Sequence, residues 1–115
     1  MSVRIYHNPR CSKSRQALQL LAERQVATDV VEYLKTPPDA AELGAILDML
    51  GLEPRQLMRR KEPEYKSSNA DDPKLTRDEL IGLMVAHPRL IERPIVVSDG
   101  KAVLGRPPER TLEIL

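Results

Sequence analysis

Residues 3–22 read VRIYHNPRCSKSRQALQLLA, and they predict a strand, a turn and the start of a helix, in that order. Val3–Tyr6 alternates apolar and polar side chains as a half-buried strand does, and the next four residues are typical of a turn. A helix is then predicted from Ser12. Its apolar stripe is expected at three positions: Leu18, Leu21 and Ala22. This order puts Cys11 at the amino terminus of a helix that follows a strand.

Further strands complete a small sheet around this segment. Thr28–Leu34 is rich in valine and predicts a second strand, parallel to the first because one helix connects them. Near the end of the chain, 95–97 and 102–104 flank Asp99-Gly100, a pair suited to a type I′ hairpin turn. A closing helix is predicted from Pro107-Pro108. The pattern indicates an α/β protein with a mixed four-stranded sheet and flanking helices.

A helical insertion is predicted between the two halves of this sheet, over about residues 39–88. Asp39 with Glu42, and Thr76 with Glu79, have the spacing of helix amino-terminal caps. The expected elements are a helix from Asp39 to Gly51, a short helix from Pro54 to Lys61, a loop over 66–74, and a helix from Thr76 that ends before Pro88. At 115 residues we expect one domain for the whole chain.

The composition limits the partners and the compartment of this protein. A net charge of +1, with no Phe, no Trp and three Tyr, provides neither a basic surface nor an aromatic platform for nucleic acid. No stretch approaches the roughly 18 apolar residues of a membrane helix, and no apolar leader follows Met1. One cysteine and two histidines are too few for a zinc site. We expect a cytoplasmic protein that binds no metal, nucleic acid or membrane.

Cys11 is the residue with the strongest chemical signal. The free N–H groups at a helix amino terminus lower the pKa of a thiol, as do nearby cations, and Arg10 and Lys13 flank Cys11. The same N–H groups attract an oxyanion. Because this is the only cysteine, redox chemistry needs a second thiol from outside the chain. The alternative is a buried cysteine with a purely structural role.

Five strings carry a family resemblance: YHNPRCSKSR at 6–15, LMR at 57–59, HP at 87–88, RPIVV at 93–97 and GRP at 105–107. In this order, over essentially all 115 residues, they resemble the glutaredoxin-coupled arsenate reductase family, and most of all its short ArsC-related bacterial members. The resemblance implies a thioredoxin-like fold with a helical insertion. It also implies a cis peptide bond before Pro94.

The resemblance assigns roles to individual residues. It makes Cys11 the nucleophile and Arg59, Arg93 and Arg106 the ligands of the arsenate oxyanion, which guanidinium groups match in charge and geometry. His7 and Ser14 would support the cysteine through a hydrogen bond or a positive charge. We expect alanine at Arg93 or Arg106 to abolish arsenate turnover and to leave alkylation of Cys11 largely intact.

The reaction that the resemblance implies starts with attack of the Cys11 thiolate on arsenate. Glutathione is then a co-substrate, glutaredoxin supplies the electrons, and no cofactor is bound. Two other functions stay open at this point. One is a thiol-disulfide oxidoreductase of the same fold that acts on a glutathione-linked substrate. The other is a polymerase-binding regulator similar to Spx, although Ser14 stands where those proteins carry the second cysteine of their switch.

Overall fold

The structure, a computed structural model, describes residues 3–115. The chain divides into two compact units. Unit 1 consists of Met1–Thr36 and Arg93–Leu115, and unit 2 of Pro37–Glu92. In the part of the chain that the structure describes, no helix is both long enough and apolar enough to cross a membrane.

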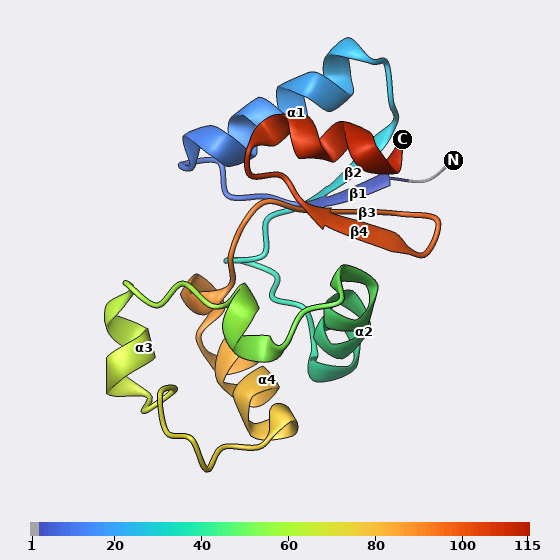
Figure 1. Cartoon of the computed structure of the whole chain (residues 1–115). Coiled ribbons are helices and arrows are strands. Elements are labelled where there is room, and N and C mark those ends of the chain that lie inside the picture. Colours follow the sequence, from blue (N-terminus) through green and yellow to red (C-terminus); the bar gives the residue numbers. More distant parts are fainter. Residues whose placement is uncertain (1–2) are drawn as a thin grey trace. The chain divides into compact units, whose positions relative to one another are not determined.

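Unit 1 is built on a mixed four-stranded sheet in the order β2-β1-β3-β4. Its strands are β1 (Val3–Tyr6), β2 (Thr28–Val31), β3 (Ile95–Ser98) and β4 (Lys101–Leu104). β1 pairs parallel with β2 and antiparallel with β3, which pairs antiparallel with β4. Helix α1 (Ser12–Glu23) and the 3-10 helix η3 (Pro108–Ile114) lie side by side on one face of this sheet (Figure 1). The βαβ-ββα order and the mixed sheet confirm the predicted thioredoxin-like fold.

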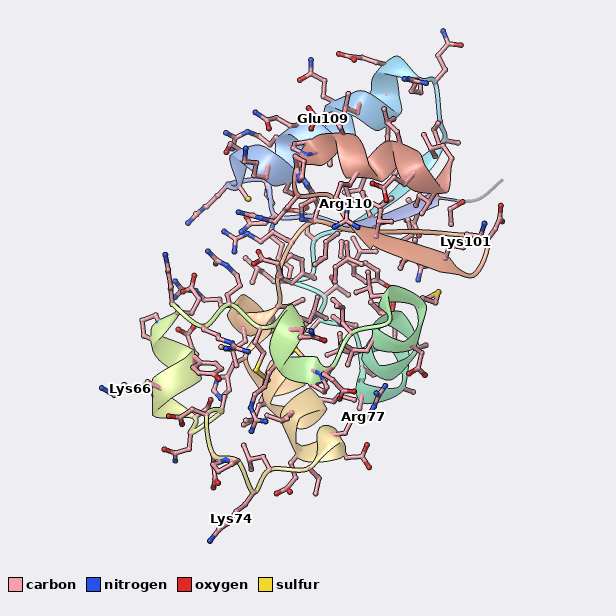
Figure 2. The ribbon with its side chains drawn as sticks, in the orientation of Figure 1. Lys66, Lys74, Arg77, Lys101, Glu109 and Arg110 are labelled. Atoms are coloured by element: carbon pink, nitrogen blue, oxygen red, sulfur yellow. The ribbon has the colours of Figure 1, made fainter. Side chains whose placement is uncertain are left out.

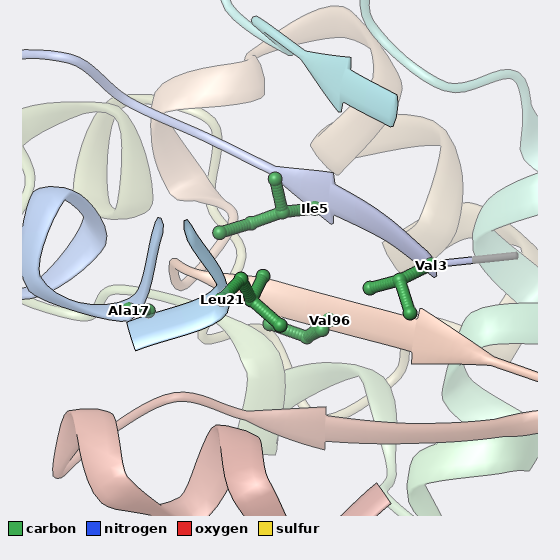
Figure 3. Close-up of a cluster of buried hydrophobic side chains, with 5 residues drawn as sticks. All are labelled: Val3, Ile5, Ala17, Leu21 and Val96. Carbon is green, nitrogen blue, oxygen red and sulfur yellow. The ribbon is translucent and has the colours of Figure 1, made fainter. Parts of the chain in front are cut away.

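The core of unit 1 lies between α1 and the sheet. Five buried side chains form it (Figure 3): Val3, Ile5, Ala17, Leu21 and Val96. The predicted stripe of the helix was partly wrong, because Ala22 is exposed and Leu18 is half-buried. The buried positions of α1 are Ser14, Ala17 and Leu21, so the inward face includes Ala17, which the predicted stripe omitted.

Two features of the sheet depend on local turn chemistry. The β3–β4 hairpin turns at Asp99 and Gly100, whose φ angles of 50° and 77° are those of the predicted type I′ turn. β2 is shorter than predicted and ends at Val31. The amides of Lys35 and Thr36 both donate to the carbonyl of Glu32, and this turn ends the strand before Leu34.

Unit 2 is helical. Its elements are α2 (Ala40–Leu50), the 3-10 helix η1 (Pro54–Leu57), α3 (Pro63–Ser67), α4 (Arg77–Ala86) and the 3-10 helix η2 (Pro88–Leu90). The cap predictions are confirmed: Asp39 accepts from the Glu42 amide at 2.8 Å, and Thr76 and Glu79 form a reciprocal capping box. α2 ends at Gly51, whose φ of 68° is left-handed, and α4 ends before Pro88.

Two predictions in unit 2 were wrong. The short helix from Pro54 stops at Leu57 rather than Lys61, because Met58 is extended and forms a β-bridge with Ile91. The predicted loop over 66–74 begins inside α3. The side chains of Lys66 and Lys74 nevertheless extend away from the ribbon into solvent (Figure 2).

Candidate active site

Cys11 occupies the amino-terminal cap of α1, as predicted. Its backbone is extended, with φ −95° and ψ 122°, its amide donates to the Asn8 carbonyl at 3.0 Å, and its carbonyl accepts from the Arg15 amide at 3.0 Å. The side chain is 8% exposed and the thiol is free. Backbone hydrogen bonds through its amide and its carbonyl therefore hold this buried cysteine in place.

Ser14 ties the loop before Cys11 to the first turn of α1. Its hydroxyl accepts from the Asn8 amide at 3.0 Å and lies 2.6 Å from Nδ1 of His7. Ser14 and His7 are both buried, with exposed fractions of 0% and 6%. The guanidinium of Arg15 closes the loop from outside by donating to the Pro9 carbonyl at 2.9 Å. The structure thus brings the predicted supporting residues, His7 and Ser14, to the turn that carries Cys11.

The imidazole of His7 has a pKa below its ordinary value. Burial lowers the pKa of His7, and the positive charge of Arg15 lowers it further, while Glu32 acts in the opposite direction. Of the two roles considered from the sequence, this environment favours a hydrogen bond over a positive charge.

The thiol of Cys11 has a pKa below its ordinary value. Burial raises the pKa, but this is outweighed by a hydrogen bond from the Ser14 amide, by a hydrogen bond and the charge of the Arg93 guanidinium, and by the Lys13 amide. From the sequence, the side chains of Arg10 and Lys13 were expected to lower the pKa of the Cys11 thiol. Both are exposed, and Lys13 acts through its backbone. The cationic side chain comes instead from Arg93, which is remote in sequence.

Arg93 and Arg106 lie next to each other in unit 1. Nη1 of Arg106 donates to the carbonyl of Arg93 at 3.2 Å. The peptide bond between Arg93 and Pro94 is cis, as predicted, and the bond between Arg106 and Pro107 is cis as well. The Gly105 amide donates to the Pro94 carbonyl at 2.9 Å, which joins the two segments. Cys11, Arg93 and Arg106 therefore belong to one constellation, with Arg93 as its centre.

Gly105 is a residue that the sequence reasoning did not select for its packing. A Cβ atom at this position would lie 2.9 Å from Cγ of Pro94, 2.9 Å from Oγ1 of Thr111 and 3.3 Å from Cβ of Ala17. Only glycine allows this approach of the segment before Arg106 to the loop before β3. The GRP string contained the glycine, but no local pattern indicated its neighbours.

Arg59 belongs to unit 2. Its amide donates to the Leu90 carbonyl at 2.7 Å, and its guanidinium forms ion pairs with Glu62 and, at 3.8 Å, with Glu92. Arg60, its neighbour in the sequence, is exposed. The grouping of Arg59 with Cys11 stays a prediction.

Within residues 3–115, no three His, Cys, Asp or Glu side chains come together as the ligands of a metal ion would. The site consists of a thiol with a lowered pKa at a helix amino terminus, beside a guanidinium and a cis-proline. These features define a thioredoxin-like protein with an activated single cysteine.

Comparison with known proteins gives the family. The model of the ArsC family matches residues 6–114. Uncharacterized protein YfgD of Escherichia coli (strain K12) is 56% identical over 114 residues, which cover 98% of this chain and 96% of that protein. An arsenate reductase of Neisseria meningitidis is 51% identical over 114 residues, which cover 98% of this chain and 97% of that protein. The solved structure of an arsenate reductase from Vibrio cholerae matches with a TM-score of 0.97 at 53% identity, with coverage of 100% and 98%. The chain belongs to the ArsC family.

Proposed function

We propose that this protein is an arsenate reductase that converts arsenate to arsenite with Cys11 as its nucleophile. The observation that carries the proposal is the Arg93 guanidinium beside the Cys11 sulfur, where it stabilises the thiolate. A guanidinium in this place also attracts a tetrahedral oxyanion to the atom that attacks it. The relatives named arsenate reductase, at 51% identity and at a TM-score of 0.97, support the same substrate.

In the first step the Cys11 sulfur attacks the arsenic atom of arsenate. An S–As bond forms, one As–O bond breaks, and the departing oxygen leaves as water after taking up protons. Arsenic stays in the +5 state in this step. Arg93 and Arg106 would bind the remaining oxygens, and the amides of Ser14 and Lys13 would keep the sulfur anionic until it reacts. Arg59 is proposed as the third guanidinium.

The electrons must come from external thiols because Cys11 is the only cysteine in the sequence. A glutathione thiol displaces a second oxygen as water, which leaves arsenic bonded to Cys11 and to glutathione. A glutaredoxin thiolate then attacks the glutathione sulfur. The electron pair of the broken S–As bond stays on arsenic and reduces it to the +3 state, while a glutathione–glutaredoxin disulfide forms. Hydrolysis of the remaining S–As bond releases arsenite and restores Cys11.

This chemistry consumes reduced thiols, so we place the protein in the cytoplasm, where glutathione and glutaredoxin stay reduced. No bound cofactor is needed, because glutathione enters as a co-substrate.

The test is NADPH oxidation in the presence of arsenate, glutathione, glutathione reductase and glutaredoxin. The wild-type protein should reduce arsenate and so oxidise NADPH, and Cys11→Ser should not. Leaving out glutaredoxin should stop turnover if it is the electron donor. Absence of turnover in a protein whose Cys11 still reacts rapidly with iodoacetamide would remove arsenate as the substrate. The next substrate to test would then be a glutathione-linked disulfide.

A further inference from the structure

Two cations flank Cys11 within unit 1. Arg10 precedes it, with its amide held by Oδ1 of Asn8 at 3.0 Å, and Lys13 follows it in the first turn of α1, with its amide bonded to the sulfur. Both side chains are exposed, and among residues 3–115 neither forms a hydrogen bond or an ion pair. Because consecutive Cα atoms are about 3.8 Å apart, both residues start within about 8 Å of the Cα of Cys11. The surface next to the nucleophile therefore carries positive charge that no group in the described part of the chain neutralises.

These cations stand where a helix disfavours positive charge. The free N–H groups at a helix amino terminus carry a partial positive charge, so acidic side chains are favourable there and cations are not. The first turns of α2, α3 and α4 all contain acidic residues. The first turn of α1 has none, and no Asp or Glu precedes Glu23 in the sequence. Helix stability therefore does not account for Lys13, which increases the positive charge of this end of α1.

The other roles that a cation could have in this loop are taken by different groups. The guanidinium of Arg15 closes the loop by donating to the Pro9 carbonyl at 2.9 Å. The charge that lowers the pKa of the Cys11 thiol is not that of Arg10 or Lys13, because the only cationic side chain among its causes belongs to another segment. The side chains of Arg10 and Lys13 thus serve neither the loop nor the thiolate, and both remain available to a molecule that approaches Cys11.

The proposed reaction brings such a molecule to this surface, since the only cysteine of the chain needs an external thiol. Glutathione carries a carboxylate at each end and a net negative charge at neutral pH. Carboxylates are the groups that guanidinium and ammonium side chains bind best, by charge-assisted hydrogen bonds. An uncharged thiol has the same sulfur chemistry but no group for these cations. The charge at the surface therefore distinguishes between the two kinds of thiol.

We propose that the side chains of Arg10 and Lys13 bind the carboxylates of the external thiol, so that the surface around Cys11 selects a thiol of the glutathione type over an uncharged one. This inference rests on the proposed function, in which glutathione is the co-substrate, and adds the residues that recognise it. Arsenate is also an anion, so the experiment leaves arsenate out.

The experiment measures the reaction of Cys11 with two disulfides. With oxidised glutathione, the Cys11 thiolate attacks one sulfur, a Cys11–glutathione disulfide forms, the original S–S bond breaks, and the other glutathione leaves as its thiolate. The same exchange with the uncharged disulfide of mercaptoethanol reports the reactivity of the thiol itself. Both rates are followed by the mass of the intact protein, because the chain has no second cysteine to remove the mixed disulfide.

We expect Arg10→Gln and Lys13→Gln each to slow the reaction with oxidised glutathione about threefold, and the double variant about tenfold, as for the loss of exposed ion pairs. The rate with the mercaptoethanol disulfide should not change, because neither side chain stabilises the thiolate. In the wild type, added salt should slow only the reaction with oxidised glutathione, since salt screens exposed charges.

Two further variants serve as controls. Arg24→Gln removes the same charge from an exposed residue at the other end of α1, roughly 18 Å from Cys11 for a helix that rises about 1.5 Å per residue. It should react with both disulfides as the wild type does. Arg10→Lys keeps the positive charge and should retain the preference for oxidised glutathione.

Each outcome decides the inference. An unchanged rate with oxidised glutathione in the double variant would overturn it, and so would an equal loss in Arg24→Gln, which would show an effect of net charge alone. Equal slowing with both disulfides would also overturn it, because the side chains would then act on the thiol. Failure of the proposed function has a different signature: arsenate would give no NADPH oxidation, while the wild type and the double variant still differ toward oxidised glutathione. Recognition of a glutathione-type thiol would then stand, with a substrate other than arsenate.

Discussion

Cys11 combines burial with a lowered pKa, two properties that usually oppose each other. Burial alone raises the pKa of a thiol, because the thiolate loses hydration. Here the amides of Ser14 and Lys13 and the guanidinium of Arg93 replace water around the sulfur. The nucleophilicity of the Cys11 sulfur therefore depends on the side chain of Arg93, which is distant in sequence, and on the backbone amides in the first turn of α1.

The first prediction concerns the pH dependence of that thiol. The rate of Cys11 alkylation by iodoacetamide should rise with pH around a midpoint below that of an ordinary cysteine thiol. Arg93→Gln should move this midpoint to higher pH, because the thiolate loses the guanidinium that stabilises it. Alkylation at neutral pH should then become slower, about tenfold if the thiol pKa rises by 1. This replaces the sequence-based expectation that alkylation of Cys11 would stay largely intact after substitution of Arg93.

Arg10→Gln is the control for this measurement. Arg10 is adjacent to Cys11 in sequence but is exposed, and it is not among the groups that change the pKa of the thiol. The pH midpoint of Cys11 alkylation in Arg10→Gln should equal that of wild type. A higher midpoint in Arg10→Gln with no change in Arg93→Gln would show that the flanking charges, and not Arg93, stabilise the thiolate.

The second prediction concerns Gly105. Gly105→Ala places a methyl group 2.9 Å from Cγ of Pro94, and a proline ring cannot swing away as a flexible side chain can. We expect a loss of about 1–3 kcal/mol in the free energy of unfolding, as for other overpacked sites. Gly82→Ala in α4 is the matched control, because nothing lies within 4 Å of its Cβ. That change should be neutral or stabilise by up to about 1 kcal/mol, since alanine favours a helix. Urea unfolding of both variants checks the difference.

At the scale of elements, the signals that succeeded were local. The caps at Asp39 and Thr76, the left-handed stop at Gly51 and the Asp99-Gly100 turn each act through bonds within a few residues, so their spacing in the sequence is sufficient to identify them. The errors came where a distant segment decides the backbone. The helix from Pro54 ends early because Met58 pairs with Ile91, which lies far along the chain.

The third prediction concerns the capping box of α4. Thr76→Ala removes the acceptor of the Glu79 amide and should lower the free energy of unfolding by about 1 kcal/mol. Thr76→Ser keeps a hydroxyl and should stay close to wild type. Equal stability of the alanine and serine variants in urea would mean that solvent satisfies the amide as well as the cap does.

At the scale of the whole molecule, the candidate site is assembled from segments that no local pattern connects. Cys11 could be selected from its position at a helix start, but its link to Arg93 required either the fold or the family strings. The neighbours of Gly105, on α1, the β3 loop and η3, are likewise a property of the tertiary structure. The ion pairs of Arg59 illustrate the same limit: Glu62 stands at a helical spacing from it, whereas nothing in the sequence pointed to Glu92.

The two units are also connected through the chain, because unit 2 is inserted between the two parts of unit 1. If unit 2 unfolded alone, unit 1 would have to close a flexible loop of about 50–60 residues, at a cost of about 3–4 kcal/mol. Each unit holds roughly half of the 115 residues, a size at which a core alone gives marginal stability. Both arguments favour the single cooperative domain expected from the sequence.

The last prediction tests this cooperativity by hydrogen exchange. Leu47→Ala creates a cavity at a fully buried position of α2 and should cost about 2–5 kcal/mol. If the units unfold together, the slowest amides of β1 in unit 1 should lose as much protection as those of α4 in unit 2. Leu21→Ala, at a fully buried position of α1, is the reciprocal variant and should lower protection in both units as well. If each substitution lowered amide protection only in its own unit, the chain would contain two independently unfolding domains. The cost of loop closure and the marginal stability of each unit would then be too small to make the two units unfold together.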